Sequence, residues 1–312
     1  MNPTDNDAFA GLPVDAIEHA LTAGGMAVTR TGNGLIGRQG KIITHISFEQ
    51  PEDPDSENGD IRAVLTVKSE LPVELAPLFE KPGSLAAFSR YATLAAPVLE
   101  EGIPVLGSRI TLYEAEDALN IQVPLIVATA LMAPQVMLDT IRHVLAGMGD
   151  KRPKESAWGE RDFARAHQYL SRMSVCTADA GGLTAEFGLR QNSLLAITGD
   201  HHTALWRMFA DQPHPEAGGG LLCCLEMPHR TGDEAALPTV LARLNAMEMA
   251  PLDRPPHFGA WCPGTLGDNP AYVSFLPNFL HGVGGIAVNL SFWAYGRAQW
   301  ADAMLPSLGL RA

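Results

Sequence analysis

The feature that most constrains the fold is an internal repeat of long period. Residues 234–304 read as a helix, two strands and an apolar helix, in that order. Residues 84–146 show the same order in the first half of the chain, and a proline follows the apolar run of the second strand in both copies (Pro124 and Pro277). Repetition over so long a period is typical of a duplicated structural unit, so we expect two related copies.

The spacing of apolar residues assigns two strands and a closing helix to each copy. In the first copy we predict strands at 106–112 and 119–127 and a closing helix at 130–145. In the second copy we predict strands at 258–262 and 271–278 and a closing helix at about 285–304.

Each half also begins with a helix and a run of strands, so both halves read α-β-β-β-α-β-β-α. Strands grouped together and flanked by helices indicate an antiparallel sheet in an α+β fold, and argue against a doubly wound fold. A polar stretch around Pro153 separates the halves. We therefore predict two tandem domains, residues 1–150 and residues 151–312.

Gly32, Gly34 and Gly37 have the spacing of a dinucleotide-binding loop. That loop requires a helix that begins within it, because the helix amides bind the pyrophosphate. Residues 38–48 alternate instead as a strand, and Gly-Asn-Gly is a hairpin turn signal. We therefore predict a β-hairpin here and expect no nucleotide or other cofactor.

The charge and cysteine content narrow the class of protein. A net charge of −13 argues against nucleic-acid binding, which needs a surplus of Lys and Arg on one face. The first residues are polar and unlike a signal peptide, and no uninterrupted apolar run reaches the roughly 18 residues that span a membrane. We expect a cytoplasmic protein in which Cys176, Cys223, Cys224 and Cys262 are reduced.

Recognisable motifs for metal binding and nucleophilic catalysis are missing from the sequence. Histidines gather in the second half, but no Cys-x-x-Cys or His-Glu-x-x-His spacing occurs, so we expect no metal site. No Gly-x-Ser-x-Gly elbow is present either. An enzyme whose site is assembled between the halves, using Asp200, His201 and His202, is the alternative hypothesis for function.

Four segments of the second half carry a family resemblance. They are the Leu-Leu-Cys-Cys-Leu run within 220–228, a Leu-Asn helix at 241–247, a Phe-Gly strand at 258–262 and an apolar strand at 272–278. In this order, before a long last helix, they are similar to the class I type III secretion chaperones and the YbjN-like proteins. The resemblance implies a non-enzymatic peptide-binding module that works as a homodimer. Two copies in one chain would then form an intrachain pseudo-dimer.

The resemblance and the missing catalytic motifs predict binding of an unidentified protein or peptide partner, with no nucleic acid and no membrane involved. A bound segment would add to a sheet edge or fill an apolar pocket. The candidate contacts are apolar side chains on strand faces that we expect the helices to leave uncovered, and one tryptophan off the apolar stripe of the last helix. They are Ile42, Ile46, Phe48, Trp206, Met208 and Trp293. Further association of the chain into a homodimer is compatible with this hypothesis.

Overall fold

The computed structural model describes residues 12–49, 61–113, 116–146, 154–189, 202–250 and 255–311. The first half forms α1 (Val14–Ala23), β1 (Ala27–Thr31), β2 (Gly34–Gln39), β3 (Ile42–Glu49), β4 (Ile61–Glu70), α2 (Ala76–Phe79), α3 (Pro82–Ser89), β5 (Ala96–Glu100), β6 (Ile103–Tyr113) and α4 (Glu116–Ala146). The second half forms α5 (Glu160–Leu170), β7 (Val175–Ala178), β8 (Gly182–Gly188), β9 (Thr203–Phe209), β10 (Gly220–Glu226), α6 (Leu237–Glu248), β11 (Ala260–Pro263), β12 (Pro270–Pro277) and α7 (Ile286–Met304).

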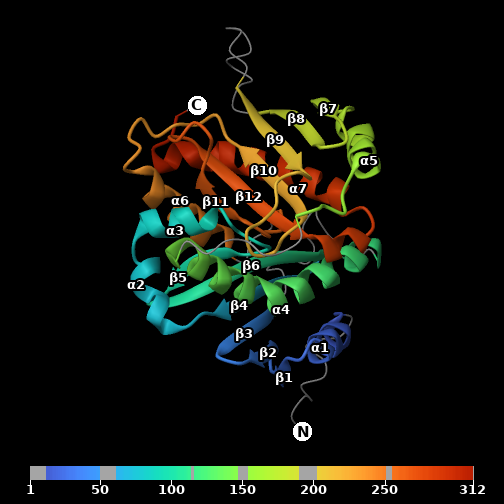
Figure 1. The fold of residues 1–312 in the computed structure, drawn as a ribbon, viewed down its shortest axis with the longest axis vertical. Helices are drawn as coiled ribbons and strands as arrows, with labels where there is room; N and C mark the ends of the chain where they lie inside the picture. Colours follow the sequence, from blue (N-terminus) through green and yellow to red (C-terminus); the bar gives the residue numbers. More distant parts are fainter. Residues whose placement is uncertain are drawn as a thin grey trace.

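The strands form two antiparallel six-stranded sheets with the same topology. The strand orders are β1-β2-β3-β4-β6-β5 and β7-β8-β9-β10-β12-β11. Each sheet takes its strands from one half of the chain, and the two sheets lie one above the other in Figure 1. The α+β class is therefore confirmed. The element order needs one correction, because four strands, not three, precede the second helix of the repeat in each half.

Residues 119–127 are not a strand, as we predicted, but part of the long helix α4. Their β-branched residues favour a strand locally, and packing overrides that preference. Gln122, Leu125 and Thr129 are buried at helical spacing, and the helix continues through Pro124 and Pro134. By composition α4 is apolar enough to span a membrane, but 67% of the relevant window is buried inside the protein. That burial is typical of a core helix.

The second strand of this copy, which we predicted at 119–127, is β5. It precedes β6 in the chain and forms a hairpin with it. Its turn contains Glu101 and Gly102, both with positive φ (50° and 82°). Two consecutive residues in this region make the tight turn that suits a twisted hairpin. In the second half, β7 was also missing from our prediction, because its four residues are too few to show alternation.

The predicted hairpin at Gly32–Gly34 is confirmed, since Thr31 pairs with Gly34 across a two-residue turn. Gly34 begins β2, and Gly182 begins β8 at the equivalent place in the second half. A Cβ added at Gly34 would lie 1.8 Å from the carbonyl oxygen of Ile46, and one at Gly182 would lie 2.2 Å from that of Met208. Both sheets thus need a glycine where two strands approach closely.

Helices cover one face of each sheet, which we call the inner face. α1 and α4 pack on the first sheet, and α5 and α7 pack on the second. The helices bury the main apolar core against these faces, and this core includes residues of both halves. The opposite face of each sheet is its outer face.

The halves meet through equivalent elements. α3 packs on α6 and β11, while α6 packs on α3 and β5, which is the reciprocity of an isologous interface. Small apolar residues of β5, β6, β11 and β12 form a cluster at this junction, and Figure 1 shows α3 and β5 beside α6 and β11. Most of the predicted linker, 147–156, lies outside the described residues, and the division into domains stays a prediction.

Candidate functional site

Cross-strand pairing allows the two outer faces to be compared position by position. Starting from Gly34 in the first sheet and from Gly182 in the second, we list the residues that are paired across successive strands. Each sheet then gives one row of four side-chain positions on its outer face. The first row is Gly34–Ser47–Thr66–Arg109, and the second row is Gly182–Phe209–Leu222–Phe275. The first row is polar and ends in an arginine, whereas the second is apolar.

A buried network of charged side chains surrounds Arg109 at the junction. Arg109 donates from Nε to the carbonyl of Glu248 (2.9 Å) and from Nη2 to the carbonyl of Pro255 (2.9 Å). The Glu248 carboxylate accepts a bond from Nε of Arg297 in α7 (2.7 Å). The network therefore ties β6 of the first half to α6 and α7 of the second.

Aromatic side chains complete this network. The Tyr272 hydroxyl lies 3.2 Å from Nδ1 of His257, and the Trp261 indole donates to Glu248 (3.1 Å). The Arg297 guanidinium lies 3.9 Å from the centre of the Tyr272 ring, within the range of a cation–π interaction. All of these side chains are buried.

Burial and the neighbouring charges shift the pKa values of the network strongly. Burial alone would raise the pKa of Glu248, but Arg297 and then His257 outweigh it and lower the pKa to about 2. Burial lowers the pKa of His257 to about 3, despite the opposing effect of Glu248. Burial also raises the pKa of Tyr272. At neutral pH the network therefore holds an ionised carboxylate and a neutral imidazole.

Shifted pKa values often mark active sites, but ion-pair networks within a core shift them too. The cavity beside this network has a volume of about 20 Å³ and is lined by Trp206, Phe258 and Trp293 among others. That volume is about enough for one water molecule. The network is therefore a structural connection between the halves, with no room for a substrate.

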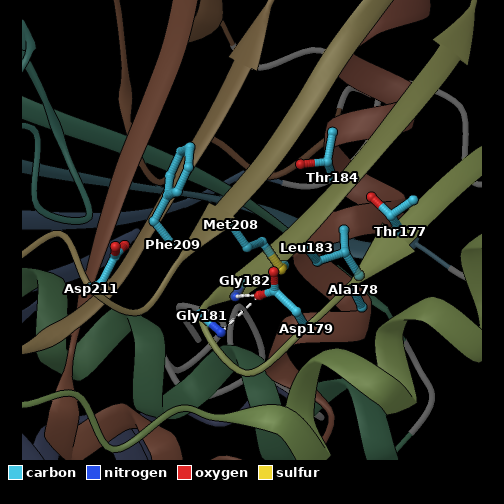
Figure 2. Close-up of a pocket in the computed structure, with 10 residues that line it drawn as sticks. All are labelled: Thr177, Ala178, Asp179, Gly181, Gly182, Leu183, Thr184, Met208, Phe209 and Asp211. Atoms are coloured by element: carbon cyan, nitrogen blue, oxygen red, sulfur yellow. Dashed lines mark hydrogen bonds between the residues drawn. The ribbon is translucent and has the colours of Figure 1, made fainter.

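A larger hollow of about 290 Å³ lies on the second sheet, at the end of the β7–β8 hairpin. Figure 2 shows Phe209 and Asp211 on one side of it and Thr177 and Thr184 on the other, with Asp179 between them. Oδ1 of Asp179 accepts bonds from the amides of the two glycines in the turn (2.8 and 3.0 Å). Because Gly182 has no side chain, the surface beside Phe209 is left open.

Next to this hollow the outer side of β7, β8 and β9 is partly exposed and partly apolar. Val175 is 71% exposed, and Leu205, Phe209 and Leu222 are half-buried. Within the described part of the chain β7 has β8 as its single neighbour, so it forms an edge of the sheet. Nε2 of His167 lies 3.1 Å from the carbonyl oxygen of Cys176 in β7, so one acceptor of this edge has a partner. We call the outer side of β7, β8 and β9 the open face.

Two further hollows flank the junction at equivalent positions. One, of about 490 Å³, contains His45 and Glu70, whose side chains are hydrogen-bonded (3.0 Å). The other, of about 310 Å³, contains Glu226, whose carboxylate pairs with Arg207 and accepts two bonds from Thr265 (2.6 Å each). The charged residues that carry these two pairs match by register, His45 with Arg207 and Glu70 with Glu226.

The predicted contact residues do not form an exposed surface. They lie in the core, except for one that is half-buried on α7: Ile42, Ile46, Phe48, Trp206 and Met208 are buried, and Trp293 is partly exposed. The expectation that the helices leave these side chains uncovered is wrong. The helices cover the inner faces, on which these side chains lie, because that side of each sheet is the more apolar.

The open face escaped the sequence analysis because β9 is apolar on both sides. Trp206 and Met208 point inward, while Leu205 and Phe209 point outward. Alternation shows which residues share a face, but it cannot show which face is covered when both are apolar. Apolar residues at successive positions of a strand were the available signal that both faces make contacts.

The structure describes one of the three residues proposed for an enzyme site. Asp200 and His201 lie outside the described residues, and His202 is half-buried near His229. His229 is buried, with Nε2 3.4 Å from a carboxylate oxygen of Asp302. Burial lowers the pKa of His229. Among the described residues no group of three or more His, Cys, Asp or Glu side chains could hold a metal ion, and all four cysteines are free.

No protein-family model matches the chain, and neither the curated proteins nor the solved structures contain a match to it. The resemblance to the type III secretion chaperones and the YbjN-like proteins therefore rests on the sequence patterns alone.

Proposed function

We propose that this protein is a non-enzymatic, chaperone-like module that binds an extended segment of a partner protein on its open face. The observation that carries the proposal is the difference between the two outer faces. The second sheet has the half-buried Phe209 and Leu222 where the first has Ser47 and the buried Thr66. Exposed apolar surface costs free energy in water, so such a surface is typical of a binding site.

The location of the titratable groups favours binding over catalysis. Glu248, His257 and Tyr272, with their strongly displaced pKa values, are buried at the junction and away from the open face. A catalytic site usually brings such groups together in an accessible pocket. An enzyme that uses Asp200, His201 and His202 stays the alternative hypothesis. A cytoplasmic location stays part of the proposal.

The equivalent packing of the halves supports a pseudo-dimer within one chain. In this proposal the second half supplies the open face, and the first half covers the junction side of the second sheet. One contact of this kind is the bond from the amide of Phe275 to the carbonyl of Ala92 (2.9 Å). The partner is a protein, with no role for nucleic acid or membrane, and a homodimer of the whole chain is not required.

Site-specific photocrosslinking tests the proposal, because register supplies a matched control. A benzophenone amino acid at Val175 should form adducts with a distinct protein in cells that express the chain. The same probe at Ala27, the exposed position equivalent to Val175 on β1, should form none.

Substitutions then separate binding from folding. Phe209→Asp should abolish the adducts formed at Val175, with the melting temperature little changed, because Phe209 is half exposed. Ser47→Asp, at the equivalent position, should leave them intact. Equal labelling from Val175 and Ala27, or adducts that survive Phe209→Asp, would disprove the proposal. So would turnover of a small molecule that is lost in His202→Ala.

A further inference from the structure

We infer that the segment bound on the open face is cationic, with apolar residues alternating with Lys or Arg. This inference rests on the proposed function and adds the chemistry of the partner. It follows from the charges that surround the apolar side chains, together with the alternation that an extended backbone imposes.

Three acidic side chains lie on or next to the open face. Glu186 lies beside Val175 on the neighbouring strand and is exposed. Asp179 and Asp211, which are also exposed, line the hollow from the hairpin turn and from the end of β9 (Figure 2). These three carboxylates come from different segments and lie around one surface.

Within the described strands β7 to β10 a single side chain is basic. It is Arg207, which lies on the open face and pairs with Glu226. The excess charge of the open face is therefore negative.

The outer face of the equivalent hairpin in the first half carries a positive charge instead. Arg38 stands where the second half has Glu186, whereas Arg30 lies on the inner side and pairs with Asp15 and Glu18. Because the backbone arrangement is the same, the reversal belongs to the side chains and not to the fold. A cationic segment is attracted to the second hairpin and repelled by the first.

The apolar residues set the alternation. Side chains of an extended segment point alternately toward and away from the sheet. Those that point toward it meet Val175, Leu205 and Phe209 and bury apolar area. Long lysine and arginine side chains between them can reach Glu186, which lies between Val175 and Leu205 in one cross-strand row, and Asp179 and Asp211 at the end of the hairpin.

Fluorescence anisotropy with designed peptides tests the inference on the full chain. The first probe is a labelled nonapeptide in which Leu alternates with Lys, and the second has Glu in place of Lys. A third has the composition of the first with its Leu residues grouped together. The alternating Lys peptide should bind at least about tenfold more tightly than either of the others in low salt. This advantage should shrink at physiological ionic strength, because salt screens exposed charges.

Charge reversal on the protein gives the matched control. Glu186→Lys should weaken binding of the alternating Lys peptide severalfold, whereas Arg38→Glu at the equivalent position should leave it unchanged. Circular dichroism checks that both variants are folded.

If the Lys and Glu peptides bind equally and Phe209→Asp weakens both, the inference is wrong and the proposed function stands. If no peptide binds and position 175 gives no adducts, both fail. Self-association that is lost in Glu186→Lys would make a second copy of the chain the occupant, and would also overturn the inference.

Discussion

The two sides of the junction share a backbone contact between the halves but carry different side chains. Arg109 and Phe275 occupy equivalent positions of the two sheets, and each is bonded through its backbone to a segment from the other half. The amide of Arg109 donates to the carbonyl of His257 (3.2 Å), and the amide of Phe275 donates to that of Ala92 (2.9 Å). The backbone contact is thus repeated, while the side chain changes from a buried cation to an aromatic ring.

The difference shows which part of the junction depends on charge. Around Arg109 the side chains of Glu248 and Arg297 are buried and need one another, because an unpaired buried charge is costly. Phe275 packs against the ring of His214, with the ring centres 5.1 Å apart, so the contact here is aromatic. The charged side should therefore be sensitive to any change that leaves a charge uncompensated, and the aromatic side chiefly to loss of volume.

The largest effect is expected for Glu248→Ala. This change leaves the buried guanidinium of Arg297 without its carboxylate, and should lower the free energy of unfolding by about 3–5 kcal/mol. Urea denaturation measures it. Glu100→Ala, which removes a partly exposed ion pair with Lys68, should cost at most about 1 kcal/mol. Similar losses for the two variants would contradict the role given to the buried network.

Leucine at each equivalent position compares the two sides directly. Arg109→Leu removes the side-chain donor to the carbonyl of Glu248 and leaves the carbonyl of Pro255 with the longer bond from Arg297 (3.3 Å), so it should cost about 3 kcal/mol. Phe275→Leu keeps most of the apolar volume and should cost about 1 kcal/mol. Thermal melts of the two variants under one condition rank them. A greater loss for Phe275→Leu would reverse our account of the junction.

The charged side should also make stability depend on pH. The pKa of His257 is lowered to about 3 in the folded protein, from an ordinary value near 6.5. Between these values the unfolded chain binds a proton that the folded one does not, so stability decreases as the pH falls below about 6.5. At pH 5 the loss from this group is about 2 kcal/mol. Stability should depend less on pH in His257→Gln, while His45→Gln, at a half-exposed site, serves as control. Unchanged pH dependence in His257→Gln would rule out this contribution.

The smallest effect concerns the two equivalent side-chain pairs beside the junction. Glu226 is buried and bonded to Arg207 and Thr265, so Glu226→Gln should cost about 1.5 kcal/mol. Glu70 and its partner His45 are partly exposed, and Glu70→Gln should cost less than about 1 kcal/mol. Chemical denaturation at pH 7 resolves this difference, and equal values would mean that burial does not distinguish the pairs.

Much of the fold could be predicted from the sequence, because hydrophobic period and turn residues act locally. The Gly32–Gly34 turn, the strand ending at Pro277 and the helix ending at Met304 all carry such signals. The repeat itself was visible because both copies keep the same order of elements. The strand at 119–127 was wrong, since the long-range packing of α4 on the first sheet decided its conformation.

The site was less predictable than the fold. No local sequence pattern predicts that Arg109 contacts Glu248, which lies 139 residues away along the chain. The contact residues were chosen on the wrong faces, because Trp206 and Leu205 are both apolar and neighbouring strand positions point in opposite directions. Burial by a helix from elsewhere in the sequence, not propensity, separates the core face of β9 from its open face.

The long sequence separation of the contacts at the junction has a consequence for synthesis on the ribosome. Arg109 donates to Pro255, which is made 146 residues later. At roughly 5–20 residues per second, the first sheet waits roughly 7–30 s for the segment that covers its junction side. During that interval Val98 and Val105, which are buried in the finished protein, lack their apolar neighbours Ala260 and Cys262. The nascent first half thus exposes an apolar surface for a time. Slow translation of the second half would lengthen the period in which this surface can aggregate.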